Sequence, residues 1–503
     1  MDIKLASTSP IAAKVGLVAV PVFEEDLDKK AEHALLAAAG AALDGKLLDV
    51  LKQERFEGKA NQKLVVPTYG KLPASALVLL GLGKRSAYTH EAFRMAAGTV
   101  AREARRLQSA KIAVALPEGV DLAEAVRAGA EGLRLGAYRF DKWKTQDTPD
   151  KGFSISQASL HHEDLRRSAA AQKALELGNA IGEAVAFARD LINESPSLMT
   201  PTALAQAAQK MAKGAGLTVV VHDRKKLEQM KMGMFLAVAQ GSKEEPRLIE
   251  IRYTPKGGAG AKAKPLAFVG KAITFDSGGL SLKPADAMVD MKTDMSGGAA
   301  VIAAMKVIGE VIQPNFPVYG FVGACENMPS GTAYRPGDIV TSRSGKTVEI
   351  TNTDAEGRLV LGDVLTYACE TKPRGVVDVA TLTGACIVAL GHYTVGTFGA
   401  DEAFVGQVLD AARAAGEDFW RMPLVPEVKE NLRSDVADLK NAGSRWGGAI
   451  SAAQFLQEFV GDTPWVHLDI AGPSTSDKDR GYIGKGGTGV AVRTLVELTR
   501  MQK

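Results

Sequence analysis

Charged residues occupy every second position from 354 to 358 in the segment 352–359, which reads Asn-Thr-Asp-Ala-Glu-Gly-Arg-Leu. In an extended segment, Asp354 and Glu356 would project to the same side, because side chains alternate along a strand. Arg358 follows at the same spacing, and an apolar pattern typical of a helix begins at Leu359. Two carboxylates and a guanidinium where a strand meets a helix can form a metal-dependent hydrolytic site. Taken alone, the pattern is more often a solvated turn with an ion pair.

A second group of charged residues lies upstream of this segment. Residues 265–269 predict a buried strand, because they are apolar and bounded by turn formers. Lys271 and Asp276 flank a second short apolar run, and a Gly-Gly pair then predicts a tight turn before Lys283. Asp294 precedes a run of small residues that predicts a helix, where an aspartate is ordinarily an N-cap. Each of these residues alone also fits an ordinary surface position.

Four carboxylates share one kind of position, at the end of a predicted strand or the start of a predicted helix: Asp276, Asp294, Asp354 and Glu356. In open α/β sheets, ligands bind beyond the carboxyl ends of the strands. Four converging carboxylates repel one another unless divalent cations neutralise them. No histidine occurs between His222 and His392, so an imidazole-based zinc motif is absent there. Oxygen ligands favour Mg²⁺ or Mn²⁺, and Zn²⁺ also accepts carboxylates.

A lysine could join such a site only as a neutral amine. Burial and neighbouring cations would both lower the pKa of that amine. We therefore expect a lowered pKa for any lysine that binds metal here.

Three segments resemble the signature blocks of the leucine aminopeptidase family, also called cytosol aminopeptidases: VGKAITFDSGGLSLK, MKTDMSGGAA and NTDAEGRL. Their order and spacing also fit, and the chain is similar to bacterial aminopeptidase A-like dimetal exopeptidases. The resemblance extends from about residue 165 to the C-terminus, with a more variable N-terminal domain.

The resemblance implies a metal-dependent aminopeptidase that removes the N-terminal residue, leucine and other mainly apolar residues, from peptides. Two divalent metal ions per subunit, Mn²⁺ or Zn²⁺, would activate a hydroxide. The implied ligands are Lys271, Asp276, Asp294, Asp354 and Glu356, and Asp276 and Glu356 would bridge both ions. Lys283 and Arg358 would be the catalytic residues that bind no metal. Lys283 would stabilise the oxyanion, and Arg358 would hold a bicarbonate that acts as general base.

The resemblance also implies an apolar subsite for the first side chain of the substrate, lined by Met291, Thr381, Gly384 and Ala471. Met291 and Thr381 are equally explained as core residues. Ser474 stands where some members have a bulky apolar residue, which argues against a strict leucine preference. Ala272 replaces a glycine that many members have, and leaves every ligand in place.

Composition predicts a soluble globular protein with two domains, because the chain has 503 residues, 46% hydrophobic and 24% charged. No secretory signal pattern occurs at the N-terminus, and we expect no apolar run of membrane-spanning length. Cysteines at positions 325, 369 and 386 have unrelated spacings, which suggests reduced, buried thiols. The expected location is cytoplasmic.

The predicted fold class is α/β, with two domains. With the resemblance, it comprises a smaller N-terminal α/β (macro-like) domain at 1–160, a linker helix at 161–195, and a larger catalytic zinc-exopeptidase-like domain at 196–503. The larger domain would have a mixed central sheet flanked by helices. In the N-terminal domain, the pattern predicts strands at 14–22, 63–67, 76–82 and 111–116, and helices at 27–51, 90–107 and from 121. The low-complexity residues 256–264 predict a flexible hairpin loop.

Two features that resemble functional motifs have simpler explanations. The glycine-rich residues 484–489 lack the spacing of a phosphate-binding loop, and they predict the entry to a last helix at 490–499. His467 alternates within a predicted strand, and we expect a hydrogen-bonded core histidine.

Two alternative functions remain open. Some bacterial relatives also bind DNA, but the net charge is only +3, and the cluster Arg102, Arg105, Arg106 and Lys111 is more typical of a solvated helix. A dimetal phosphoesterase would also use paired metals, although the lysine ligand and the complete signature blocks argue against it. The expected partners are peptides with a free N-terminus and further copies of the chain in a homohexamer, with neither DNA nor a membrane.

Overall fold

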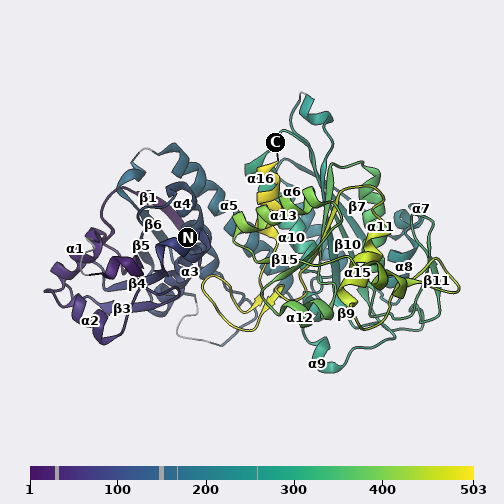
Figure 1. The fold of residues 1–503 in the computed structure, drawn as a ribbon, viewed down its shortest axis with the longest axis horizontal. Helices are drawn as coiled ribbons and strands as arrows, with labels where there is room; N and C mark the ends of the chain where they lie inside the picture. The colour runs from purple at the N-terminus through teal and green to yellow at the C-terminus, as the bar shows by residue number, and fades with distance from the viewer. Residues whose placement is uncertain (29–32, 147–151, 167, 258, 503) are drawn as a thin grey trace. The chain divides into compact units, whose positions relative to one another are not determined.

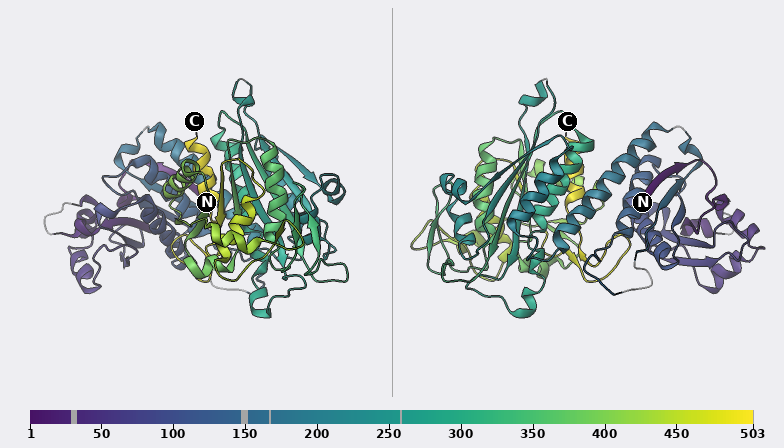
Figure 2. Two further views of the ribbon diagram at one scale, coloured as in Figure 1. Left: turned by 45° about the vertical axis from the view of Figure 1, so that its right-hand side comes forward. Right: turned by 180° about the vertical axis from the view of Figure 1, so that it is seen from behind.

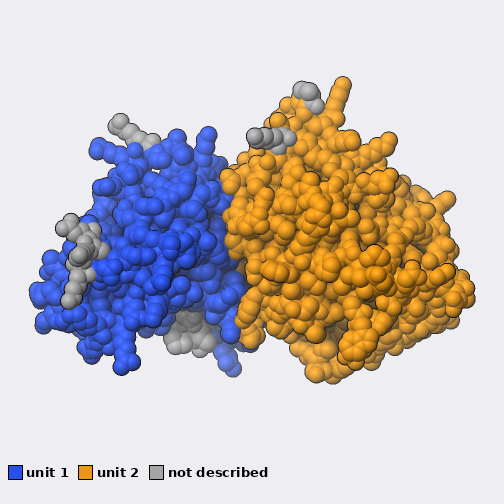
Figure 3. Space-filling model, in the orientation of Figure 1, with its two compact units in different colours: residues 1–183, 478–485 blue, residues 184–477, 486–503 orange. Residues whose placement is uncertain are grey.

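A computed structural model describes residues 1–28, 33–146, 152–166, 168–257 and 259–502 (Figure 1). The chain forms two compact units, coloured separately in Figure 3. Unit 1 comprises Met1–Glu183 and Lys478–Lys485, and unit 2 comprises Ala184–Asp477 and Gly486–Lys503. Both units combine helices with a central sheet, and each is described separately below.

Unit 1 contains a six-stranded sheet with the order β1-β6-β5-β2-β4-β3. Its strands are β1 (Asp2–Ala6), β2 (Leu17–Phe23), β3 (Lys63–Pro67), β4 (Ala76–Gly83), β5 (Lys111–Ala115) and β6 (Gln157–His161). Neighbouring strands are parallel except β3 and β4, which are antiparallel.

Helices cover both faces of this sheet. Alternate residues of β2 point to opposite faces: Leu17 and Ala19 pack in one apolar cluster, and Val18 and Val20 pack in another. The first cluster includes residues of α3 (His90–Arg106) and α4 (Leu122–Ala137), and the second includes residues of α1 (Ala34–Ala42) and α2 (Leu47–Gln53). A strand that is buried on both faces accounts for the unbroken apolar run of β2.

The single helix predicted at residues 27–51 is wrong within the described residues, and positions 29–32 lie outside them. Two helices, α1 and α2, are separated by a turn in which Asp44 and Gly45 have φ of 55° and 77°. An Asp-Gly pair is a turn signal, and it ends the first helix. The strands predicted at 63–67, 76–82 and 111–116 and the helices predicted at 90–107 and from 121 are confirmed by β3, β4, β5, α3 and α4.

Residues 478–485 complete unit 1 against helix α3. Arg102 donates from Nε to the Gly481 carbonyl at 2.6 Å and from Nη2 to the Ile483 carbonyl at 2.9 Å. A Cβ atom at Gly98 would lie only 2.4 Å from the backbone nitrogen of Tyr482, so the helix and the segment touch backbone to backbone. The predicted solvated role of Arg102 is therefore wrong, since its side chain is only 16% exposed.

Unit 2 contains an eight-stranded sheet with the order β15-β14-β17-β13-β9-β10-β8-β7. Its strands are β7 (Leu217–His222), β8 (Arg247–Tyr253), β9 (Leu266–Asp276), β10 (Val318–Asn327), β13 (Gly375–Ala380), β14 (Val395–Phe398), β15 (Phe419–Arg421) and β17 (Trp465–Asp469). The four central strands β17, β13, β9 and β10 are parallel, while β14 pairs antiparallel with β17 and β8 with β10. The sheet is therefore mixed, with a parallel centre.

Two layers of helices flank this sheet (Figures 1 and 2). One layer contains α8 (Gly233–Ala239), α11 (Gly357–Glu370) and α15 (Gly448–Gln457), which share an apolar cluster with the sheet. The other contains α6 (Pro201–Ala212), α10 (Ser296–Val307), α13 (Glu402–Ala415) and α16 (Val492–Met501). A Cβ atom at Gly270 of β9 would lie 2.6 Å from the Cα of Gly298 in α10, so glycines bring this helix unusually close to the central strands.

Three local predictions for this part of the chain need correction or completion. Residues 266–276 form one continuous strand, β9, not two short ones. Residues 256–264 do not form a hairpin, because β10 lies between β8 and β9 in the sheet, and residue 258 lies outside the described residues. A long helix, α5 (Ala169–Asn193), occupies the region of the predicted linker helix.

One stretch of unit 2 is long and apolar enough to cross a membrane by length and composition alone. It spans residues 285–312 and includes α10. The expectation that no such stretch exists is therefore wrong on length. However, 78% of its apolar window is buried inside the protein, as expected for a helix in the core of a globular unit.

His467 of β17 is completely buried, and its Nδ1 lies 2.6 Å from Oδ1 of Asp378 in β13. The prediction of a hydrogen-bonded core histidine is confirmed. The predicted last helix is α16, which begins at Val492, two residues later than expected.

Candidate active site

Four parallel strands of unit 2 end at the same edge of the sheet. Their last residues are Asp276 of β9, Asn327 of β10, Ala380 of β13 and Asp469 of β17. Polar side chains at the carboxyl ends of adjacent parallel strands converge on one crevice. The site residues lie in these strands and on the loops and helices that follow them.

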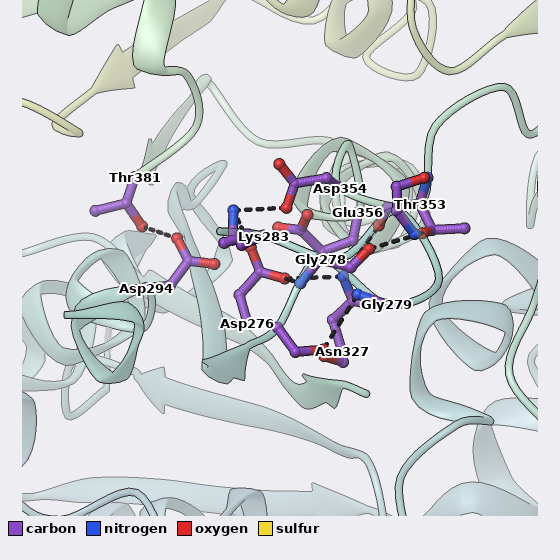
Figure 4. Close-up of polar contacts among 12 residues, drawn as sticks. Asp276, Gly278, Gly279, Lys283, Asp294, Asn327, Thr353, Asp354, Glu356 and Thr381 are labelled. Atoms are coloured by element: carbon purple, nitrogen blue, oxygen red, sulfur yellow. Dashed lines mark hydrogen bonds and ion pairs between the residues drawn. The ribbon is translucent and has the colours of Figure 1, made fainter. Parts of the chain in front are cut away.

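Asp276 is held by the loop that follows it (Figure 4). Its Oδ1 accepts hydrogen bonds from the Gly278 backbone N–H and from Nδ2 of Asn327, both at 2.8 Å, and its Oδ2 lies 2.9 Å from Nζ of Lys283. Gly278 has a φ of 85°, and a Cβ atom there would lie 2.5 Å from the Ser281 carbonyl. The loop thus needs glycine to turn the chain beneath the carboxylate.

Asp354 and Glu356 lie on a turn, not on a strand. The Asp354 backbone N–H donates to Oδ1 of Asn352 at 2.8 Å, and Glu356 has helical dihedrals of −78° and −38° at the start of α11. The predicted extended geometry of this segment is therefore wrong. The carboxylates still face the same site, but each has its own lysine. Lys283 Nζ lies 2.6 Å from Asp354 Oδ1, and Lys271 Nζ lies 2.9 Å from Glu356 Oε1.

Asp294 follows a 3-10 turn at Met291–Thr293 and precedes α10, whose N-cap is Met295. The ordinary explanation of Asp294 as an N-cap is therefore wrong. Its Oδ1 accepts from Oγ1 of Thr381 at 2.7 Å (Figure 4). The same oxygen lies 2.9 Å from Nζ of Lys271. Its side chain thus faces the crevice.

Three buried carboxylates form a compact cluster. Asp276, Asp294 and Glu356 each place one oxygen within 4.8 Å of the others. Oδ2 of Asp294 and Oε2 of Glu356 are buried and have no hydrogen-bond partner among the described residues. Buried carboxylate oxygens ordinarily have partners, and hard oxygen ligands are the ones that divalent cations prefer. The donor set therefore fits a divalent metal ion.

The cluster changes the ionisation of its members. Burial raises the pKa of Asp294 to about 8, although the positive charge of Lys271 opposes this shift. Burial lowers the pKa of Lys271, but the carboxylates of Asp294 and Glu356 outweigh it and raise that pKa well above its ordinary value. The prediction of a lowered lysine pKa rests on two effects, burial and neighbouring cations. Burial alone does not neutralise the amine of Lys271.

Arg358 lies in the first turn of α11 and is only 8% exposed. Its Nη1 donates to the Asn441 carbonyl at 2.9 Å, while its Nε is buried without a hydrogen-bond partner among the described residues. Burial lowers the pKa of Arg358 to about 10, and Glu356 and Asp469 oppose this shift. The guanidinium remains charged at neutral pH, and its buried Nε–H is unpaired among the described residues.

The predicted subsite residues come from three different segments of the chain. Thr381 and Gly384 follow β13, Ala471 follows β17, and Met291 begins the 3-10 turn before Asp294. Thr381 contacts the site directly, because its carbonyl accepts from Nζ of Lys271 at 2.8 Å. A Cβ atom at Gly384 would meet nothing within 4 Å, so this position faces open space.

Sequence reasoning missed three buried polar residues that organise the site. Asn327 donates from Nδ2 to Asp276 and, at 3.0 Å, to the Thr353 carbonyl. Asn441 donates from Nδ2 to the Asn352 carbonyl at 2.7 Å and so holds the turn that carries Asp354. Asp469 binds the loop after β13 through several hydrogen bonds. Asn327 and Asp469 end central parallel strands, and that position is a signal available from the predicted sheet.

A buried group of carboxylates with lysines, at the carboxyl edge of a mixed α/β sheet, defines a metal-dependent hydrolase site. Comparison with known proteins specifies the class further. A model of the cytosol aminopeptidase family, catalytic domain, matches residues 186–496, and a model of the N-terminal domain of the same family matches residues 19–147. The chain belongs to the cytosol aminopeptidase family and is an aminopeptidase.

Individual relatives agree over nearly the whole chain. A probable cytosol aminopeptidase of Alkaliphilus metalliredigens (strain QYMF) is 45% identical over 462 residues, which are 91% of each chain. One of Geobacter sp. (strain M21) is 43% identical over 99% of this chain and 100% of the relative. These matches confirm the family resemblance of the three signature segments.

Solved structures show the same architecture. A variant of tomato leucine aminopeptidase is similar with a TM-score of 0.90 and 34% identity, covering 100% of this chain and 97% of that chain. The bottromycin maturation enzyme BotP in complex with Mn is similar with a TM-score of 0.83 and 36% identity, covering 96% and 99%. The predicted two-domain α/β fold, with a mixed sheet in the larger domain, is confirmed.

Proposed function

We propose that this aminopeptidase uses two divalent metal ions, Mn²⁺ or Zn²⁺, to release leucine and other mainly apolar N-terminal residues from peptides. The proposed ligands are Lys271, Asp276, Asp294, Asp354 and Glu356. The observation that carries the proposal is the compact, buried carboxylate cluster with two oxygens that lack partners among the described residues. A relative solved in complex with Mn supports the choice of ion.

The bound ions would polarise the scissile carbonyl and acidify a water molecule at neutral pH. The protein would contribute the fixed positions of the ligands. Asn327 and the Gly278 N–H orient Asp276, and Thr381 orients Asp294. Partners of this kind hold ligands in place and raise the affinity for metal.

Lys283 is the proposed residue for oxyanion stabilisation. Its side chain is 15% exposed, whereas that of Lys271 is only 3% exposed, so its ammonium lies nearer to the open side of the cluster. Burial lowers the pKa of Lys283, but Asp276 and Glu356 outweigh it and raise the pKa above its ordinary value. A lysine that stays charged can stabilise the negative charge that develops on the carbonyl oxygen.

Arg358 is the proposed residue for holding bicarbonate. Its buried Nε has no partner among the described residues, and a guanidinium binds planar oxyanions through paired donors. Bicarbonate in this position would supply the general base.

Met291, Thr381, Gly384 and Ala471 are proposed to line the subsite for the first side chain. The open space beside Gly384 supports room for a side chain there. The proposal also includes the homohexamer and the cytoplasmic location that the family resemblance implies. Light scattering on the purified protein tests the assembly, which would have six times the mass of the 53.0 kDa chain.

Metal removal followed by readdition tests the proposed function. The purified enzyme is stripped with a chelator, and Mn²⁺, Zn²⁺ or Mg²⁺ is added back while turnover of aminoacyl p-nitroanilides is measured. We expect activity to disappear on stripping and to return with about two ions bound per chain. Full activity without bound metal, or saturation at one ion, would contradict the proposal. A p-nitrophenyl phosphate assay in parallel tests the phosphoesterase alternative.

A further inference from the structure

We propose that Asp469 is a positioning residue, whose carboxylate fixes the shape of the pocket for the first side chain and so sets the discrimination between large and small N-terminal residues. This inference rests on the proposed function, because it takes Thr381, Gly384 and Ala471 as walls of that pocket. Asp469 itself lies behind these walls.

Asp469 is fully buried and accepts hydrogen bonds from two separate loops. Its Oδ1 accepts from the backbone N–H of Leu382 at 3.2 Å, of Thr383 at 3.4 Å and of Ala471 at 3.1 Å. Leu382 and Thr383 follow β13, whereas Ala471 follows β17. One oxygen atom therefore joins the two loops and fixes the distance between them.

The second oxygen fixes the direction of the loop after β13. Oδ2 of Asp469 accepts from Oγ1 of Thr383 at 2.7 Å, and the same Oγ1 accepts from the Cys386 N–H at 3.0 Å. Thr383 thereby forms the N-cap of helix α12 (Gly384–Leu390). Because the Thr383 hydroxyl donates one hydrogen bond and accepts another, its side chain has one preferred rotamer. Helix α12 therefore starts in one defined direction.

The opposite end of this loop is tied to the proposed ligands. Thr381 donates from Oγ1 to Asp294, and its carbonyl accepts from Lys271. Residues 381–384 are thus held at one end by the metal-binding cluster and at the other by Asp469. The carboxylate couples the position of the pocket wall to the position of the reacting bond.

Among the described residues, no carboxylate other than Asp469 accepts hydrogen bonds from both Leu382 and Ala471. Hydrogen bonds to a buried, charged acceptor are stronger than those between neutral groups, and their N–H donors lose their partner when the acceptor is removed. A loosened pocket wall lowers the discrimination that one methylene group can provide.

The test compares Asp469→Asn with the wild-type enzyme, both loaded with Mn²⁺. The measured quantity is the ratio of kcat/KM for leucine p-nitroanilide to that for alanine p-nitroanilide. The asparagine amide keeps one acceptor but presents N–H groups where the second carboxylate oxygen accepts from Thr383. We expect the ratio to fall at least about tenfold, the lower end of what such contacts provide, while the metal content stays at the wild-type value.

Asp363→Asn is the matched control. Asp363 is also fully buried and also accepts backbone N–H groups, those of Phe235 at 3.0 Å and Arg343 at 2.7 Å, but it binds neither pocket loop. Both asparagine variants lose one buried acceptor. We expect the control to lower the melting temperature and to leave the leucine-to-alanine ratio within about twofold of wild type, since only pocket contacts change that ratio.

Thr383→Val and Thr383→Ser give an independent test if Asp469→Asn does not fold. Valine removes the hydroxyl that links Asp469 to α12, and serine keeps it. We expect valine to lower the ratio and serine to restore it. An unchanged ratio in a folded, metal-loaded Thr383→Val enzyme would overturn the inference, as would an unchanged ratio in Asp469→Asn. Absence of metal-dependent aminopeptidase activity in the wild-type enzyme would instead contradict the proposed function.

Discussion

Lys271 and Lys283 contact the same acidic cluster, but they differ in what surrounds them. Lys271 Nζ contacts Asp294, Glu356 and the Thr381 carbonyl, and its side chain is 3% exposed. Lys283 Nζ contacts Asp276 and Asp354, and its side chain is 15% exposed. The enclosed amine of Lys271 suits a ligand once bound cations lower its pKa, and the more accessible ammonium of Lys283 suits a group that meets the substrate. The structure therefore supports different roles for two residues of the same type.

Lys283→Ala is expected to lower kcat by about 10²–10³-fold and to leave the metal content unchanged. The reason is that a single preorganised donor to a developing oxyanion contributes about this much, while the proposed ligands remain. Steady-state kinetics and elemental analysis of the same sample measure the two quantities.

Lys306→Ala controls for the loss of a lysine. Lys306 lies on α10 and forms an i,i+4 ion pair with Glu310, so kcat should stay near the wild-type value. An unchanged kcat in Lys283→Ala would remove the assigned role, and loss of metal would make Lys283 a residue of the binding site instead.

Helix α10 and the central strands approach each other through glycine. A Cβ atom at Gly297 would lie 2.0 Å from the Val379 carbonyl of β13, a distance that no packing adjustment of side chains can relieve. This approach carries Asp294, just before the helix, to the end of β9, where the Ile273 N–H donates to the Asp294 carbonyl at 3.1 Å. The run of small residues that predicts this helix therefore also positions Asp294, a proposed ligand.

Gly297→Ala is expected to lower the free energy of unfolding by about 1–3 kcal/mol, because the added methyl group overlaps a backbone carbonyl. Gly406→Ala provides the contrast, since Gly406 also lies within a helix, α13, but its Cβ would meet nothing within 4 Å. There the same substitution should raise the stability by about 0.5–1 kcal/mol. Urea denaturation of both variants measures these changes, and a neutral Gly297→Ala would show that the helix can move away from the sheet.

The alternation of strands and helices could be predicted because it depends on local periodicity. The break at Asp44-Gly45 was also readable as a turn dipeptide, but the alanine-rich pattern around it concealed the signal. The turn at Asp354 cannot be predicted from spacing alone, because a spacing of two residues places side chains together in more than one backbone conformation. Asp469 and Asn327 acquire their roles from the strand order β17-β13-β9-β10, which joins residues distant in sequence and cannot be read from either segment alone.

Each of the two units is built from two separate segments of the chain. Unit 1 comprises residues 1–183 of the chain together with the later residues 478–485. Arg102 on α3 holds this late segment through two carbonyl groups and through Asp479, whose Oδ2 lies 2.5 Å from Nη1 of Arg102. Contacts of this kind attach the segment to the rest of unit 1.

Arg102→Ala is expected to lower the stability of the 478–485 segment by about 1–3 kcal/mol, because the carbonyls of Gly481 and Ile483 lose their donor. The measurement is the rate of trypsin cleavage within this segment, which should increase. Arg106→Ala on the same helix is the control, since the Arg106 side chain is 58% exposed and pairs with Glu103; its effect should stay within about 0.5 kcal/mol. Equal cleavage rates in the two variants would show that Arg102 does not hold the segment.

The late entry of residues 478–485 has a consequence for biosynthesis. A ribosome delivers the amino-terminal strands and helices long before these eight positions emerge. Until then, the side of α3 at Gly98 that meets Tyr482 is uncovered. Unit 1 is therefore completed only after residues 184–477 of unit 2 have been synthesised.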